Sequence, residues 1–112
     1  MLELAQDKKE LTVVSEELSC FTYTLDLAEA TKRLWELEVP FGIYHLVNEG
    51  PCTWYDAVLD LFHICKIKAA VRAIRSENLR RAARRPKFSV LMNTKVKKMR
   101  PWKLALREYL ND

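Results

Sequence analysis

The sequence contains very little glycine. Gly42 and Gly50 are the only two glycines among 112 residues. A dinucleotide-binding fold uses the pattern G-x-G-x-x-G so that the backbone can approach the pyrophosphate at the start of a helix. Two glycines cannot make this pattern, so we expect no cofactor to be bound by this chain.

Long apolar runs and metal-ligand spacings are absent as well. No run approaches the roughly 20 apolar residues that cross a bilayer, and the acidic start of the chain lacks the basic region of a signal peptide. Cys20, Cys52 and Cys65 are odd in number and follow no ligand spacing. We therefore expect no membrane association, no metal site, and reduced, buried or half-buried thiols in a cytoplasmic protein.

The composition is that of a folded protein. Apolar residues make up 49% of the sequence, which argues against a disordered tail. A chain of 112 residues can bury one core but is too short for two. We expect a single domain that spans residues 1–112.

Charge is distributed unevenly along the chain. Residues 1–65 contain four basic and twelve acidic residues, whereas residues 66–103 contain fourteen basic residues and one acidic residue, Glu77. Two explanations are open. The basic segment binds an anionic partner, or the acidic and basic parts attract each other in the folded chain.

Two segments have the character of strands. Residues 11–14 are β-branched and are followed by polar residues, and residues 41–47 are apolar almost without alternation. The second pattern predicts a strand that is covered on both faces. Turn residues at 48–51 follow it.

Three helices are predicted from their first residues and their periodicity. Thr24 can cap a helix with Asp26 in its first turn, residues 53–56 fit a capping box, and Pro101 opens a last helix. Residues 66–85 suit either a strand and loop or a helix. Together these elements predict an α/β fold with about three short strands and three or four amphipathic helices.

Four phrases, taken in order, resemble one known family. They are Thr22-Tyr23-Thr24-x-Asp26-Leu27-Ala28, then Gly42-Ile43-Tyr44-His45-Leu46-Val47-Asn48-Glu49-Gly50 with Thr53-Trp54-Tyr55, then Arg84-Arg85-Pro86-Lys87-Phe88-Ser89-Val90-Leu91-x-Asn93-Thr94-Lys95, and Arg100-Pro101-Trp102-x-x-Ala105-Leu106-x-x-Tyr109-Leu110. Their order and spacing resemble the C-terminal, substrate-binding region of the dTDP-4-dehydrorhamnose reductase (RmlD-like) family. These proteins are extended short-chain dehydrogenases.

The resemblance implies a role in the reduction of a nucleotide sugar, and it also implies that parts needed for this reaction are missing from the chain. The family's N-terminal part is a Rossmann domain, and a hydride passes from NADPH or NADH to the 4-keto group of a dTDP-sugar. Its catalytic pair is Tyr-x-x-x-Lys, and no tyrosine of this chain is followed by lysine at that distance. We expect the substrate-binding portion of such a reductase, without the Rossmann domain and inactive on its own.

The resemblance also points to candidate binding residues. The arginine fork suits the diphosphate of a nucleotide sugar, and Thr22 and Tyr23 would border the sugar pocket. The diphosphate candidates are Arg80, Arg81, Arg84, Arg85 and Lys87. The alternatives are a solvated basic face for these cations, and packing for Tyr23.

Two other functions compete with nucleotide-sugar binding. One is a non-catalytic module that associates with itself or with a Rossmann-domain partner, because a chain without its Rossmann part would expose apolar surface. The other is nucleic-acid binding through the basic segment. We rank it last because aromatic residues are sparse there.

Overall fold

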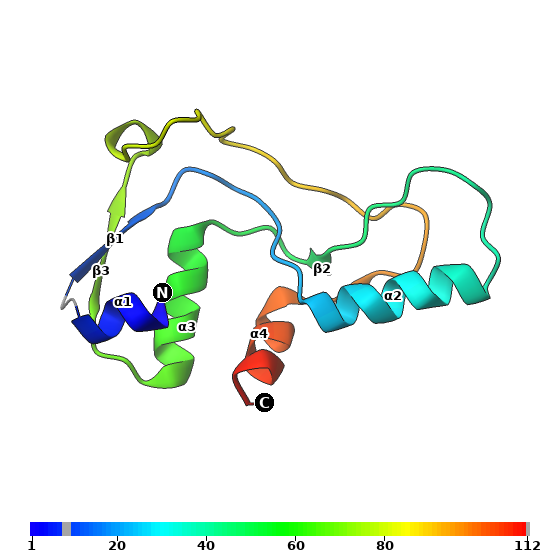
Figure 1. Cartoon of the computed structure of the whole chain (residues 1–112), viewed down its shortest axis with the longest axis horizontal. Helices are drawn as coiled ribbons and strands as arrows, with labels where there is room; N and C mark the ends of the chain where they lie inside the picture. Colours follow the sequence, from blue (N-terminus) through cyan, green and yellow to red (C-terminus); the bar gives the residue numbers. More distant parts are fainter. Residues whose placement is uncertain (8–9, 112) are drawn as a thin grey trace. The chain divides into compact units, whose positions relative to one another are not determined.

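The computed structural model describes residues 1–7 and 10–111. These residues form a mixed α/β structure with four α-helices and short parallel strands (Figure 1). They divide into two compact units. Unit 1 contains Met1–Ser19 and Cys52–Ser89, and unit 2 contains Cys20–Pro51 and Val90–Asp112. The predicted fold class is confirmed, whereas the single domain stays a prediction.

Unit 1 is built on a parallel pair of strands. β1 (Glu10–Val14) lies beside β3 (Ala70–Ile74), with Leu11 opposite Val71 and Val14 opposite Ile74. This confirms the predicted strand at residues 11–14. It also decides the ambiguous segment at 66–85, which is a strand followed by the short 3-10 helix η1 (Ser76–Asn78) and a loop. Pairing with β1 outweighs the helix propensity of this segment.

Two helices complete unit 1. α1 (Leu2–Asp7) contacts β1, and α3 (Trp54–Cys65) contacts both strands. The core consists of Leu11 and Val13 from β1 with Val58 and Phe62 from α3. Burial of such side chains contributes about 1.5–3 kcal/mol each.

The start of α3 is a capping box, as predicted. The Asp56 backbone N–H donates to Thr53 Oγ1 at 3.1 Å, and the Thr53 N–H donates to Asp56 Oδ2 at 3.1 Å. Both N–H groups would otherwise lack a partner in the helix. The helix ends at Lys66, which adopts the left-handed conformation with φ of 56°.

Unit 2 contains two helices and a second parallel pair. These are α2 (Thr24–Glu36), β2 (Asn48–Glu49), β4 (Met99–Pro101) and α4 (Trp102–Asn111), with β2 beside β4. Val47, Trp102 and Ala105 are buried. Gly50 permits a close approach, because a Cβ there would lie 3.2 Å from Trp102 Cδ1.

The predicted strand over residues 41–47 is wrong. Only Asn48 and Glu49 pair with β4, and the side chains of Phe41 and Ile43 are exposed. A strand needs a neighbour for its backbone groups, and β4 contributes only three residues. Apolar character alone therefore predicted a covered strand, whereas Phe41 and Ile43 have no segment of the described chain that covers them.

The predicted cap of α2 is also wrong. Tyr23, with φ −78° and ψ 127°, is the N-cap, and Thr24 is the first helical residue. The Tyr23 N–H is instead held by Asn48 Oδ1 at 2.7 Å. This contact comes from 25 positions away, so no local pattern predicts it.

The cysteines are buried or half-buried, as the sequence predicts. Cys52 is buried, and Cys20 and Cys65 are half-buried. Within the described residues, none of the helices has the length and apolar character needed to cross a membrane.

Candidate functional site

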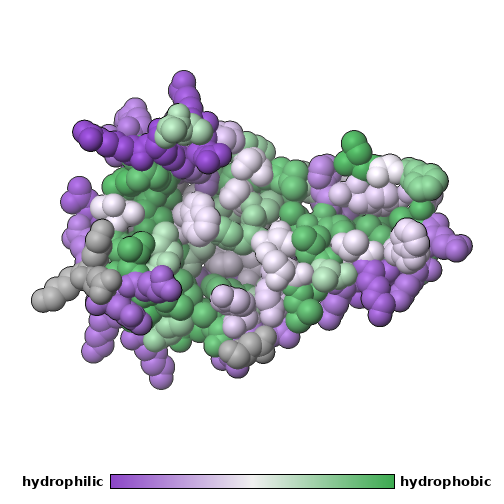
Figure 2. Space-filling model, viewed as in Figure 1, coloured by the Kyte–Doolittle hydropathy of each residue, from purple (hydrophilic) through white to green (hydrophobic). Residues whose placement is uncertain are grey.

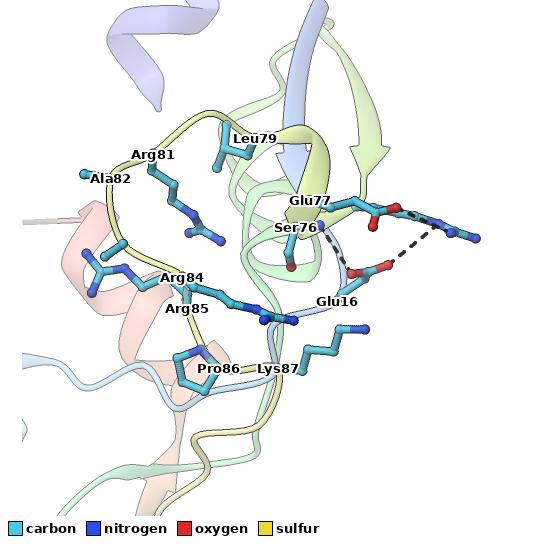
Figure 3. Close-up of a pocket in the computed structure, with 12 residues that line it drawn as sticks. Glu16, Ser76, Glu77, Leu79, Arg81, Ala82, Arg84, Arg85, Pro86 and Lys87 are labelled. Carbon is cyan, nitrogen blue, oxygen red and sulfur yellow. Dashed lines mark hydrogen bonds and ion pairs between the residues drawn. The ribbon is translucent and has the colours of Figure 1, made fainter.

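The basic loop, defined as residues 80–87, borders a cavity of about 800 Å³ in unit 1. Figure 2 shows hydrophilic side chains gathered over the segment that follows β3. Figure 3 shows the loop beside Glu16 and Ser76 on the same cavity. The lining cations are Arg75, Arg81, Arg84, Arg85 and Lys87. Four of the five predicted diphosphate residues thus lie together, and Arg80 is not part of this lining.

The segment that follows β1 holds both ends of the basic loop. Glu16 Oε2 accepts from the Ser76 N–H at 3.3 Å, before the loop. The Leu18 N–H donates to the Lys87 carbonyl at 2.8 Å, at its end. The Ser89 N–H then donates to the Leu18 carbonyl at 2.9 Å. Two residues of one extended segment therefore fix the start and the end of the loop.

Glu17, which lies between Glu16 and Leu18 in the sequence, pairs with Arg81. The Arg81 Nη2 donates to Glu17 Oε2, and the two side chains are 26% and 11% exposed. This hydrogen bond holds the pKa of the Glu17 carboxyl below its ordinary value. Glu17 is therefore a carboxylate, and the charge of Arg81 is neutralised within the protein.

The remaining charges of the cavity are unequal. Arg75 lies 3.8 Å from Glu16 and 3.7 Å from Glu77, so its charge is also shared with carboxylates. Arg84, Arg85 and Lys87 are exposed, and their side chains form no hydrogen bond or ion pair with the described residues. The charge of Arg85 also helps to lower the pKa of Glu17. Three exposed cations at one cavity favour a multiply charged anion.

One of the two sequence explanations of the charge distribution is confirmed. Ion pairs join the acidic part of the sequence to the basic part at Glu10–Arg72, Glu16–Arg75, Glu17–Arg81 and Asp26–Arg100. Binding of an anionic partner stays a prediction.

The candidate sugar-pocket residues lie in the other unit. Tyr23 packs edge-on against Tyr109, with ring centroids 6.0 Å apart, and the Arg100 guanidinium lies 6.0 Å from the Tyr23 ring centroid. Thr22 precedes it and is half-buried. Their role at a sugar stays a prediction.

Unit 2 has hollows of its own. One, of about 190 Å³, is lined in part by Cys20, Asn93 and Lys98. Another, of about 480 Å³, lies along α2 with acidic and basic side chains intermixed, including Asp26 and Arg100. Neither collects uncommitted charge of one sign as the cavity of unit 1 does.

A metal centre finds no support in the described residues. No group of three or more histidine, cysteine, aspartate or glutamate side chains within them is placed to hold an ion.

Sequence reasoning missed the carboxylates of this site. Glu16 and Glu17 were read only as polar residues after a strand, yet they hold Ser76 and Arg81. The one available signal was their position. Two adjacent acidic residues directly after a buried strand are well placed to meet a basic segment.

Comparison with known families and sequences finds similarity over the whole chain. A family model described as RmlD substrate binding domain matches residues 1–112. The spore coat polysaccharide biosynthesis protein SpsK of Bacillus subtilis is 39% identical over 116 residues, which cover 100% of this chain and 40% of that protein.

Solved structures agree. A dTDP-4-dehydrorhamnose reductase from Clostridium acetobutylicum matches with a TM-score of 0.92 and 32% identity, over 98% of this chain and 41% of that one. A second, from Bacillus anthracis in complex with NADP, matches with a TM-score of 0.91 and 25% identity, over 98% and 41%. The chain spans about two fifths of the length of these relatives and matches their C-terminal part.

Proposed function

The chain belongs to the RmlD substrate binding domain family, and from this premise we propose that it is the nucleotide-sugar-binding portion of a dTDP-4-dehydrorhamnose reductase-like protein. The observation that carries the proposal is the cavity of unit 1 with its three exposed cations, Arg84, Arg85 and Lys87. A nucleoside diphosphate sugar presents a diphosphate, which arginine binds through two parallel N–H groups.

In this proposal the cations of the basic loop bind the diphosphate. Arg84 and Arg85 supply the forked donors, and Lys87 adds a compact charge. Arg81 contributes less to the ligand, because Glu17 already neutralises it.

Reduction of a bound sugar needs groups that this chain does not supply. Its two glycines, Gly42 and Gly50, do not form a dinucleotide-binding turn, and no Tyr-x-x-x-Lys pair occurs. Nicotinamide cofactor and catalytic residues would come from a Rossmann-type part, as expected for a relative crystallised with NADP. Alone, the chain binds substrate without converting it.

Calorimetric titration of dTDP and dTDP-rhamnose into the purified chain tests the proposal. We expect binding that weakens as salt is raised, and at least about tenfold weaker binding by the double variant Arg84→Gln/Arg85→Gln. Arg107→Gln is the matched control, because Arg107 is an exposed arginine of α4 outside the cavity. Thymidine, which lacks phosphate, reports on the nucleoside alone.

The two outcomes are distinct. Binding that is lost in the double variant and kept in the control supports a diphosphate site at the basic loop. Wild-type protein that binds neither dTDP nor dTDP-rhamnose would overturn the proposal for this chain.

A second candidate function is a docking module. Trp35, Leu37, Phe41 and Ile43 at the end of α2 and after it are 86%, 66%, 108% and 74% exposed. Apolar surface of this kind is typical of a protein-protein contact. Light scattering across a concentration series tests self-association, with Phe41→Ser expected to lower the average mass. A chain that stays monomeric at high concentration would count against it.

A further inference from the structure

Glu17 makes the one side-chain contact that holds the middle of the basic loop. Among the described residues, the hydrogen bond and ion pair between Arg81 and Glu17 are the only such contacts made by residues 80–86. The loop is otherwise held at its two ends by Glu16 and Leu18. Without Glu17, no hydrogen bond or ion pair with the described residues would hold residues 80–86.

A buried carboxylate next to an anion site is unusual, and Glu17 is such a residue. It is 9% exposed, and its carboxylate lies beside Arg81. A buried carboxylate lowers the positive potential that a diphosphate would meet. On charge alone, Glu17 should therefore weaken anion binding.

We infer that Glu17 is a positioning residue of the basic loop, which strengthens anion binding by fixing Arg81 and thereby the places where Arg84, Arg85 and Lys87 present their charges. The inference rests on the proposed anion site and adds to it the residue that orders it. An ordered loop loses less conformational entropy when it binds, and this gain opposes the unfavourable charge of Glu17.

The charge of Glu17 and its role in positioning the loop predict opposite changes in anion affinity for the same substitution. Glu17→Gln keeps the shape and removes the negative charge. If charge dominated, this variant would bind an anion more tightly. If position dominates, it binds more weakly, because the neutral amide oxygen accepts a weaker hydrogen bond from Arg81 and forms no ion pair with it.

Glu77 supplies the matched control. It lines the same cavity, but its side chain is 72% exposed and contacts only Arg75, at 3.7 Å. Glu77→Gln removes the same charge from the same cavity without releasing the loop. It should leave the affinity unchanged or raise it slightly.

The binding experiment uses dTDP as the probe. We expect Glu17→Gln to bind it about tenfold more weakly than wild type, the loss that corresponds to one charge-assisted hydrogen bond. Equal or tighter binding by Glu17→Gln would overturn the inference. Glu17→Asp is the second variant. It keeps the charge but shortens the side chain, and it should also bind more weakly.

A ligand-free experiment separates this inference from the proposed function. Trypsin cleaves after arginine and lysine, and the basic loop contains Arg80, Arg81, Arg84, Arg85 and Lys87. We expect cleavage within residues 80–87 to be about tenfold faster in Glu17→Gln and Glu17→Asp than in wild type, at unchanged far-UV circular dichroism. Glu77→Gln should be cleaved at the wild-type rate.

The binding experiment and the trypsin experiment can overturn the proposed function and the positioning role of Glu17 separately. Wild-type protein that ignores dTDP would overturn the proposed function, while the trypsin experiment would still test the position of the loop. Equal cleavage rates in wild type, Glu17→Gln and Glu17→Asp would overturn the positioning role even if dTDP binds.

Discussion

Arg100 holds Asp26 through two hydrogen bonds, from Nε to Oδ2 at 2.8 Å and from Nη2 to Oδ1 at 2.9 Å. The residues are 74 positions apart, and the pair joins the first turn of α2 to β4. Arg100 also donates to Glu108 on α4. One arginine thus connects three elements of unit 2, and several consequences can be measured.

Replacing Asp26 should destabilise the fold. In Asp26→Asn one carboxylate oxygen becomes an NH2 group, which would face an N–H donor of Arg100, and the ion pair is lost. We expect the free energy of unfolding to fall by about 1–3 kcal/mol, as for other lost hydrogen bonds to a charged group. Urea unfolding measures this. Glu29→Gln, an exposed carboxylate of the same helix, should change it by less than about 0.5 kcal/mol.

Asn48 should be as sensitive although it is uncharged. Its side chain is fully buried, and its Nδ2 donates to Asp26 Oδ2 at 2.7 Å and to the Arg100 carbonyl at 3.1 Å, while its Oδ1 accepts from Tyr23. Asn48→Ala removes three hydrogen bonds at a fully buried position, and we expect the free energy of unfolding in urea to fall by about 2–4 kcal/mol. A loss no greater than that of the exposed control Asn78→Ala would contradict this role.

The capping box of α3 offers a local test. Thr53→Ala removes the acceptor for the Asp56 N–H and should lower the stability by about 1 kcal/mol. Thr53→Ser keeps the hydroxyl and should retain most of the wild-type stability. Thermal unfolding followed by far-UV circular dichroism compares the variants. Equal melting temperatures for the alanine and serine variants would show that the hydroxyl contributes nothing.

Stability should also depend on pH in a predictable direction. The pKa values of Glu17 and Asp26 are held below their ordinary values of 4.5 and 3.8, in each case first by the hydrogen bond from an arginine. A depressed pKa in the folded state adds stability that is fully present above the ordinary value. This stability is lost as the pH falls through the lower, folded pKa.

The measurement is a series of urea midpoints from pH 7 to pH 2. We expect little change attributable to these two groups between pH 7 and pH 5, and a decline below about pH 4.5. The double variant Glu17→Gln/Asp26→Asn should decline less steeply than wild type. Parallel curves for the two proteins would show that these carboxylates do not contribute.

Local sequence signals predicted much of the fold. The capping box at Thr53 and Asp56 and the helix opened by Pro101 are present because they depend on contacts between residues close in sequence. The strand at residues 11–14 is also present, although its partner β3 is distant in sequence. In the last helix Trp102 and Ala105 are buried, whereas Tyr109, at the same helical spacing, is 61% exposed. The family was indicated by four ordered phrases, which need no folded structure to be read.

Errors occurred where a distant segment decides the local structure. The apolar residues 41–47 remain outside a strand because β4 pairs only with β2. Residues 70–74 became a strand because β1 lies alongside them. In both places the backbone hydrogen bonds depend on a partner that sequence periodicity does not contain.

The sequence by itself determined the family, the composition of the basic loop and the absence of a dinucleotide-binding turn, because these are properties of residue types and their order. The tertiary structure alone decided which cations are neutralised. Glu17 lies 64 positions from Arg81, and Asp26 lies 74 positions from Arg100. An ion pair forms only when the folded backbone brings two side chains to hydrogen-bond distance, so the charges left available for a ligand were fixed by the fold.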